Sequence, residues 1–175
     1  MKNLGELRMN EADYAKLAEL EDAFERKDLE YFKTFLGKSS GLPLLLRVHS
    51  VCMLEHIGNE DIVKALGQVL RDDPSPLTRH EAAFTLGQLG FRSAVPALVE
   101  GMLKDESPIV RHESAVALSS IGAEDALPEL ERAINDKNDD VSNSALIAYE
   151  YLTYLSRKRD SVSRVGATLK PKIRL

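Results

Sequence analysis

Two histidine–glutamate pairs are the residues of this sequence with the clearest capacity for chemistry. The pairs are His80-Glu81 and His112-Glu113, and each directly follows an arginine. Imidazole together with carboxylate suits iron, manganese or zinc, whereas the absence of thiolate ligands beside the pairs argues against a structural zinc site. The pattern therefore suggests a metal site. The alternative is that duplication of one repeat copied a polar surface pair that binds nothing.

The two pairs lie in matching segments of the chain. Residues 77–90 read LTRHEAAFTLGQLG and residues 109–122 read IVRHESAVALSSIG, with weaker copies at 45–58 and 141–152. Apolar residues recur three and four positions apart, which is typical of an amphipathic α-helix. Ser-Pro precedes each of the two strong copies and glycine closes it, as expected at helix ends. We place both His–Glu pairs in the first turn of their helices, where the helix dipole would keep the carboxylates ionised.

A second, shorter apolar pattern follows each closing glycine, for example at 94–103 and 124–134. Each unit is therefore a pair of helices about 32 residues long, within the range of helical solenoid repeats. Alternating strand patterns are absent, so we predict an all-α fold, an α-solenoid of HEAT-like helical-hairpin repeats. The expected parts are an N-terminal helical cap (1–42), the repeat array (43–155) and a basic C-terminal tail (156–175).

Composition excludes several classes of protein. The 175 residues are 43% hydrophobic and 29% charged, an ordinary balance for a globular chain. The sequence has neither a signal-peptide pattern nor an apolar run of the roughly 18 residues that a membrane helix needs. We therefore expect no membrane association and a cytoplasmic location. The net charge of −5 divides into +6 for residues 156–175 and −11 for the remainder. An acidic body suits a cationic partner and argues against nucleic acid.

Two histidines and two glutamates are few for a dinuclear metal site, which typically takes about six protein ligands. A second subunit related by a twofold axis would double the number, so we expect any such site to be completed by homodimerisation. Cys52 is expected to be a small buried hydrophobic residue rather than a nucleophile. His49 falls one position away from the ligand register, and His56 lies near a helix end, so neither is a favoured ligand.

The RHEAAFTLGQLG segment, its VRHESAVALSSIG copy and the closing SALIAYEYL at 144–152 resemble the signature of the deoxyhypusine hydroxylase family. The similarity runs from Leu45 to Tyr151. That family is an α-solenoid of HEAT-like repeats in two similar halves and holds a non-haem diiron centre. The resemblance implies a metal-dependent (diiron) monooxygenase. It would use dioxygen to hydroxylate a lysine-derived, deoxyhypusine-like side chain on a translation factor precursor.

This sequence resembles one half of such an enzyme, and the resemblance also implies roles for its residues. His80 and His112 would ligate one iron, and Glu81 would reach the iron held chiefly by the other half. Glu113 would be a further ligand or would face the basic amine of the substrate, as the candidate catalytic residue. Two iron ions would be shared across the homodimer interface. A HEAT-like protein-binding scaffold without catalytic activity is the alternative function, and a relative of the bilin-attachment proteins is a third.

Overall fold

The structure is a computed structural model that describes residues 9–37 and 41–168, with side chains described as far as Arg159. These residues form helices and no β-strand, which confirms the all-α prediction. The α-helices are α1 (Glu11–Glu25), α2 (Leu29–Leu36), α3 (Leu44–Ile57), α4 (Glu60–Asp72), α5 (Pro76–Leu89), α6 (Val95–Lys104), α7 (Pro108–Ile121), α8 (Leu127–Ala133) and α9 (Asp139–Thr168), with short 3-10 helices η3 (Arg92–Ala94) and η4 (Glu124–Ala126).

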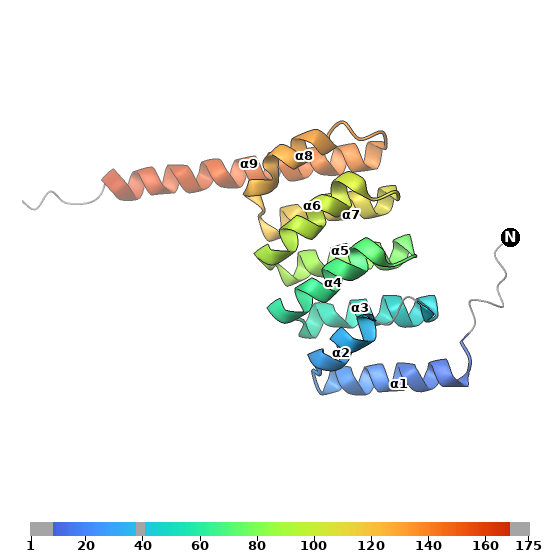
Figure 1. Cartoon of the computed structure of the whole chain (residues 1–175). Helices are drawn as coiled ribbons and strands as arrows, with labels where there is room; N and C mark the ends of the chain where they lie inside the picture. The colour runs from blue at the N-terminus through green and yellow to red at the C-terminus, as the bar shows by residue number, and fades with distance from the viewer. Residues whose placement is uncertain (1–8, 38–40, 169–175) are drawn as a thin grey trace, which may run out of the picture.

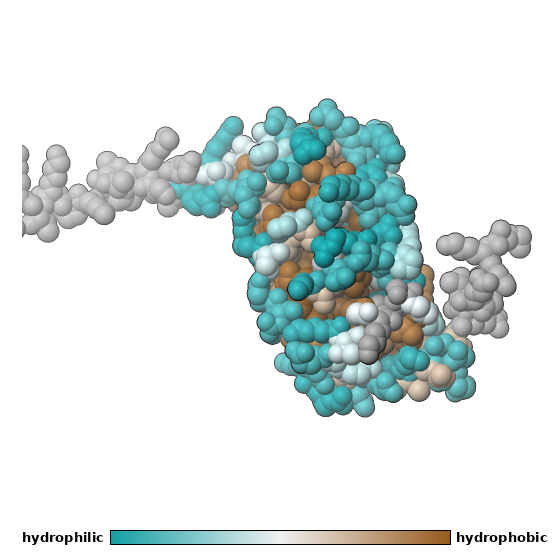
Figure 2. Space-filling view, viewed as in Figure 1, coloured by the Kyte–Doolittle hydropathy of each residue, from teal (hydrophilic) through white to brown (hydrophobic). Residues whose placement is uncertain are grey.

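The helices stack in two rows, as the predicted solenoid requires (Figure 1). The first row is α1, α3, α5, α7 and α9, and the second is α2, α4, α6 and α8. Leu54, Leu86 and Leu118 are fully buried at equivalent positions of the first row, each one repeat further along the chain. Burying one such leucine stabilises the fold by about 1.5–3 kcal/mol. Figure 2 shows apolar residues between bands of polar ones across the stack.

The helix ends follow the predicted signals. Asn10 caps α1 in a reciprocal capping box with Asp13. Pro76 begins α5, and Gly90 ends it with a φ of 74°, in the left-handed region that glycine occupies without strain. Ser75 holds the N-cap position, but its side chain makes no capping hydrogen bond.

The carboxylate that serves the start of α5 belongs to Asp73, whose Oδ1 accepts a hydrogen bond from the Ser75 backbone N–H at 2.8 Å. The same arrangement recurs one repeat later, where Asp105 accepts from the backbone N–H of Ser107 at 2.8 Å. A third copy places Asp136 before α9.

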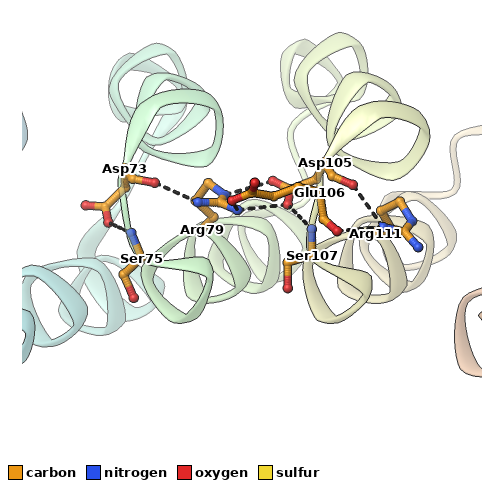
Figure 3. Close-up of polar contacts among 7 residues, drawn as sticks. All are labelled: Asp73, Ser75, Arg79, Asp105, Glu106, Ser107 and Arg111. Atoms are coloured by element: carbon orange, nitrogen blue, oxygen red, sulfur yellow. Dashed lines mark hydrogen bonds and ion pairs between the residues drawn. The ribbon is translucent and has the colours of Figure 1, made fainter. Parts of the chain in front are cut away.

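Each of these aspartates is also bound by an arginine from the preceding helix of the first row. Arg79 makes two hydrogen bonds to the Asp105 carboxylate, at 2.8 and 2.9 Å, and a third to the backbone oxygen of Asp73 at 2.9 Å (Figure 3). Arg111 repeats the pattern with Asp136 and with the Asp105 backbone oxygen. The pairs Arg47–Asp73, Arg79–Asp105 and Arg111–Asp136 therefore form a ladder, which we call the Arg–Asp ladder.

The Arg–Asp ladder links consecutive repeats through buried groups. The side chains of Arg79 and Asp105 are only 7% and 8% exposed. Hydrogen bonding to Arg111 lowers the pKa of Asp136, and hydrogen bonding to Asp136 raises the pKa of Arg111, so both groups stay charged at neutral pH. Each arginine binds two loops: the loop before its own helix and the loop before the next helix of the first row. The ladder therefore fixes the orientation of each first-row helix relative to the next.

The helix α9 is 30 residues long, against 14 for α5 and α7, and it runs beyond the side of the stack (Figure 1). It crosses the predicted boundary between the repeat array and the basic tail and continues to Thr168, while residues 169–175 of that tail lie outside the described residues. The division of the chain into three parts stays a prediction. Within the described residues, no helix is both long and apolar enough to span a membrane.

Candidate functional site

The four predicted site residues lie on the adjacent first-row helices α5 and α7. His80 and Glu81 are the fifth and sixth residues of α5, and the other pair has the same place in α7. The expectation that the pairs lie in the first helical turn is therefore wrong. With Pro76 at the first helical position, the pair begins one turn further along, so the N-terminal dipole acts on the carboxylates less than expected.

The structure joins His80 to a carboxylate of the next repeat. His80 Nε2 lies 3.4 Å from Glu113 Oε2, and Nδ1 lies 3.5 Å from Glu81 Oε1. Hydrogen bonding and charge from Glu113 raise the pKa of His80, because together with the charge of Glu81 they outweigh partial burial of the ring, which acts in the opposite direction. The Glu113 side chain is only 10% exposed. An imidazole thus lies between two carboxylates at the α5–α7 contact.

Glu81 also contacts the preceding repeat. The Cys52 thiol of α3 lies 3.6 Å from Glu81 Oε2 and acts as the hydrogen-bond donor. Burial, followed by the charge of Glu81, raises the pKa of Cys52 to about 11, so the thiol stays protonated at neutral pH. Cys52 is half-buried, more exposed than we expected for a small hydrophobic residue. A protonated thiol is a weak nucleophile, in line with the sequence interpretation.

His112 takes part in a different contact. Its Nδ1 lies 2.6 Å from the Ser144 hydroxyl of α9, and that hydroxyl is also 2.7 Å from the backbone oxygen of Asp140. In the part of the chain that the structure describes, His112 makes no ion pair with Glu81 or Glu113. The two histidines are therefore in unequal surroundings, although the sequence presents them as copies.

We call the four predicted site residues on α5 and α7 the cluster. The two histidines of the weak first repeat have no part in it. His56 is exposed near the end of α3, and its ring lies edge-on to that of Phe24, with 6.5 Å between the ring centroids. His49 is half-buried on the same helix. This placement is consistent with their low rank as ligands.

The cluster has the types of ligand atom that a metal site needs, but too few of them. The Nδ1 atom of His80 is buried and has no hydrogen-bond partner, so this nitrogen is available as a metal ligand beside the Glu81 carboxylate. Separations of 3.4 and 3.5 Å allow one ion to contact the two donors of either pair, given metal–ligand distances of about 2.0–2.2 Å. Among the described residues, however, no group of three or more His, Cys, Asp or Glu is arranged to hold a metal ion. The described part of one chain therefore does not form a metal site by itself.

Sequence reasoning missed several structural residues around the site. The aspartates of the Arg–Asp ladder were not singled out, although the sequence contains the signal: D-x-S-P occurs at Asp73–Pro76 and again at Asp105–Pro108. Ser144 was not singled out either, although it stands 32 residues after His112, one repeat offset further along the chain.

The chain is thus a helical solenoid of repeats. Buried Arg–Asp pairs join its first-row helices, and a histidine of one repeat lies against a glutamate of the next. The family model described as HEAT repeats matches residues 63–150, so the chain belongs to the HEAT-repeat family.

Particular relatives are deoxyhypusine hydroxylases. The chain is 39% identical over 56 residues to deoxyhypusine hydroxylase of Cryptococcus neoformans and 50% identical over 48 residues to that of Schizosaccharomyces pombe. These matches cover 32% and 27% of this chain and 15% of each relative. The structure of human deoxyhypusine hydroxylase in complex with glycerol aligns with a TM-score of 0.67 at 28% identity. That alignment covers 78% of this chain and 46% of the human chain, so the chain spans less than half of the relatives it matches.

Proposed function

We propose that this chain is a half-length relative of deoxyhypusine hydroxylase. It would act as a homodimer that hydroxylates a lysine-derived protein side chain with dioxygen at an iron site completed by the second subunit. The observation that carries the proposal is the contact of His80 with Glu113 of the next repeat, 3.4 Å apart. Imidazole and carboxylate from adjacent repeats meet there, as a metal site would require. The similarity to deoxyhypusine hydroxylases supports the choice of reaction.

The proposed roles follow from the surroundings of each side chain. His80 and His112 would supply imidazole nitrogen ligands, and Glu81 would reach the ion held chiefly by the partner subunit. Glu113 would be either a ligand or the carboxylate that holds the ammonium group of the substrate, because it is the more buried of the two glutamates. Iron, when bound, would supply the activation of dioxygen. The acidic charge of the body would favour a cationic side chain as substrate.

The surface around the site supports the homodimer. Ile109, His112, Glu113 and Val116 are spaced i, i+3, i+4 and i+7 on α7, so they lie on one face of the helix. Ile109 is 45% and Val116 is 38% exposed, which leaves large apolar side chains on both sides of the polar cluster. Leu45 and Leu77 continue the Ile109 row at the repeat spacing and are also exposed. Covering this face with a second copy would bury apolar surface and supply the missing donors.

A HEAT-repeat scaffold that binds another protein is the second candidate function. The same exposed apolar face favours it, because solenoid surfaces commonly bind protein partners. The two candidates differ in what they require: the enzyme needs bound metal and a second subunit, whereas the scaffold needs neither.

We expect the purified chain, loaded anaerobically with ferrous iron, to hold iron in a ratio to protein near unity, and His80→Ala to lose nearly all of it. Elemental analysis of the desalted protein measures both. The matched control is His56→Ala, which removes a histidine that lies outside the cluster and should keep the iron. Wild-type protein that retains no iron would leave the scaffold as the better interpretation.

The dimer has its own test, the double variant Leu77→Asp/Ile109→Asp. We expect a dimer for the wild type and a monomer for the variant by sedimentation equilibrium. Both positions are the second residue of their helices, where a carboxylate interacts favourably with the helix dipole, so the variant should fold. Tyr14→Asp is the control, because Tyr14 is a large side chain that is even more exposed, at 56% against 43% for Leu77 and 45% for Ile109, but it lies on α1, away from the cluster. A wild-type monomer would contradict the shared site.

A further inference from the structure

The hydroxyl of Ser144 lies between two polar atoms, both at short hydrogen-bond distance. His112 Nδ1 is 2.6 Å from Ser144 Oγ, and the backbone oxygen of Asp140 is 2.7 Å from the same Oγ. Ser144 is only 9% exposed. The three groups form a short relay from α7 to the first turns of α9.

The protons of this relay can be assigned from the number of donors. A serine hydroxyl has one hydrogen to donate, and the Asp140 backbone oxygen can only accept. If the hydroxyl hydrogen pointed to His112, the Ser144–Asp140 contact would bring two oxygen lone pairs to 2.7 Å with no hydrogen between them. If it points to Asp140, the imidazole must donate through Nδ1–H, and both contacts are hydrogen bonds. Only the second arrangement satisfies every atom.

We propose that Ser144 is a positioning residue that holds neutral His112 in the Nδ1–H tautomer and so leaves the lone pair on Nε2. Hydrogen bonding at one imidazole nitrogen sets which nitrogen can act as acceptor or metal ligand. Among the described residues, Nε2 of His112 has no hydrogen-bond or ion-pair partner. His112 also lines an open cavity of about 420 Å³ between α7 and α9, together with Ile109 and Asn143. The consequence for metal binding rests on the proposed function, whereas the tautomer does not.

The repeat geometry shows why only one histidine has such a relay. The Arg–Asp ladder places Asp136 where the preceding repeat has Asp105. Counted from these two aspartates, Ser144 has the place in α9 that Glu113 has in α7. A carboxylate, which accepts hydrogen bonds, thus faces His80, and a hydroxyl tied to a backbone oxygen faces His112. The hydrogen-bonding role of each imidazole is therefore set by the residue that faces it from the next first-row helix, and this residue differs between the two histidines.

The test is the ¹⁵N chemical shifts of the His112 ring in the metal-free, full-length chain, at a pH well above the ordinary pKa of histidine. We expect the wild type to show the Nδ1–H tautomer. Ser144→Thr keeps the hydroxyl and should keep this tautomer, whereas Ser144→Ala removes the acceptor and should shift the proton toward Nε2. Ser120→Ala is the matched control, because Ser120 lies on α7 with His112 but its hydroxyl bonds only to the Val116 backbone oxygen.

An Nε2–H tautomer in the wild type would overturn the proposal without recourse to any variant. An unchanged His112 ring in Ser144→Ala would overturn it as well. Iron uptake is measured separately on the same proteins. A wild-type Nδ1–H tautomer in a chain that binds no iron would reject the proposed function and leave the role of Ser144 intact.

Discussion

Replacing Arg79 by alanine should lower the free energy of unfolding by about 3 kcal/mol, the lower end of the cost of removing one partner from a buried ion pair. The guanidinium makes two hydrogen bonds to Asp105 and one to the backbone oxygen of Asp73. Its loss leaves the Asp105 carboxylate charged and only 8% exposed, with the Ser107 N–H as its remaining partner. We take the lower end because the array is only two helical layers thick. Urea denaturation followed by circular dichroism measures the loss.

Two controls show whether the ladder geometry is the cause. Lys104→Ala removes an exposed ion pair with Glu100 within one helix and should cost less than about 0.5 kcal/mol. Arg79→Lys keeps the charge but not the planar fork that bonds both carboxylate oxygens, so it should lie between the other two variants. A loss for Arg79→Ala no larger than that for Lys104→Ala would mean that the Arg–Asp ladder does not hold the repeats together.

The repeat period made the architecture predictable from sequence. Helix starts at Pro76 and Pro108 and helix ends at Gly90 and Gly122 follow from local backbone preferences that tertiary packing does not override. The constant offset between the copies then indicated which helices are equivalent, and equivalent amphipathic helices can bury their apolar faces only by stacking.

The site was only partly predictable, because its contacts run between repeats. Adjacent residues suggested His80 with Glu81, but the side chain that approaches His80 Nε2 is Glu113, from the next helix of the row. The last repeat has a shorter loop: Arg111 and Asp136 are 25 residues apart, against 26 for Arg79 and Asp105. This one-residue change places Ser144 against His112 where Glu113 stands against His80, and the Arg–Asp ladder shows that the two positions are equivalent.

The helices α5 and α7 approach each other closely at Gly87. A Cβ atom at this position would lie 2.8 Å from the Ala117 Cβ and 2.9 Å from its Cα. Helix-interior glycine is ordinarily worse than alanine by about 0.5–1 kcal/mol, so propensity alone predicts that Gly87→Ala stabilises the protein. The contact predicts the opposite sign, because the two backbones must separate to admit the methyl group.

We therefore expect Gly87→Ala to lower the free energy of unfolding by about 1–3 kcal/mol, the usual cost of overpacking a close contact. Gly67→Ala is the matched control in the second row. Its Cβ would lie 3.3 Å from the Ala97 Cβ, a contact that a small shift relieves, so the change should be near zero or stabilising. Thermal unfolding of the two variants side by side measures the difference in sign.

The same variant should change the candidate site, although Gly87 lies two turns of α5 away from His80. His80 on α5 and Glu113 on α7 meet across the gap that Gly87 keeps narrow, so separating the helices lengthens their 3.4 Å contact. Because Glu113 is the main cause of the raised pKa of His80, that pKa should fall toward the ordinary value of 6.5 in Gly87→Ala and stay raised in Gly67→Ala. Histidine titration by NMR on the metal-free chain measures both. An unchanged His80 titration in a destabilised Gly87→Ala would show that the site does not depend on the close approach of the two helices.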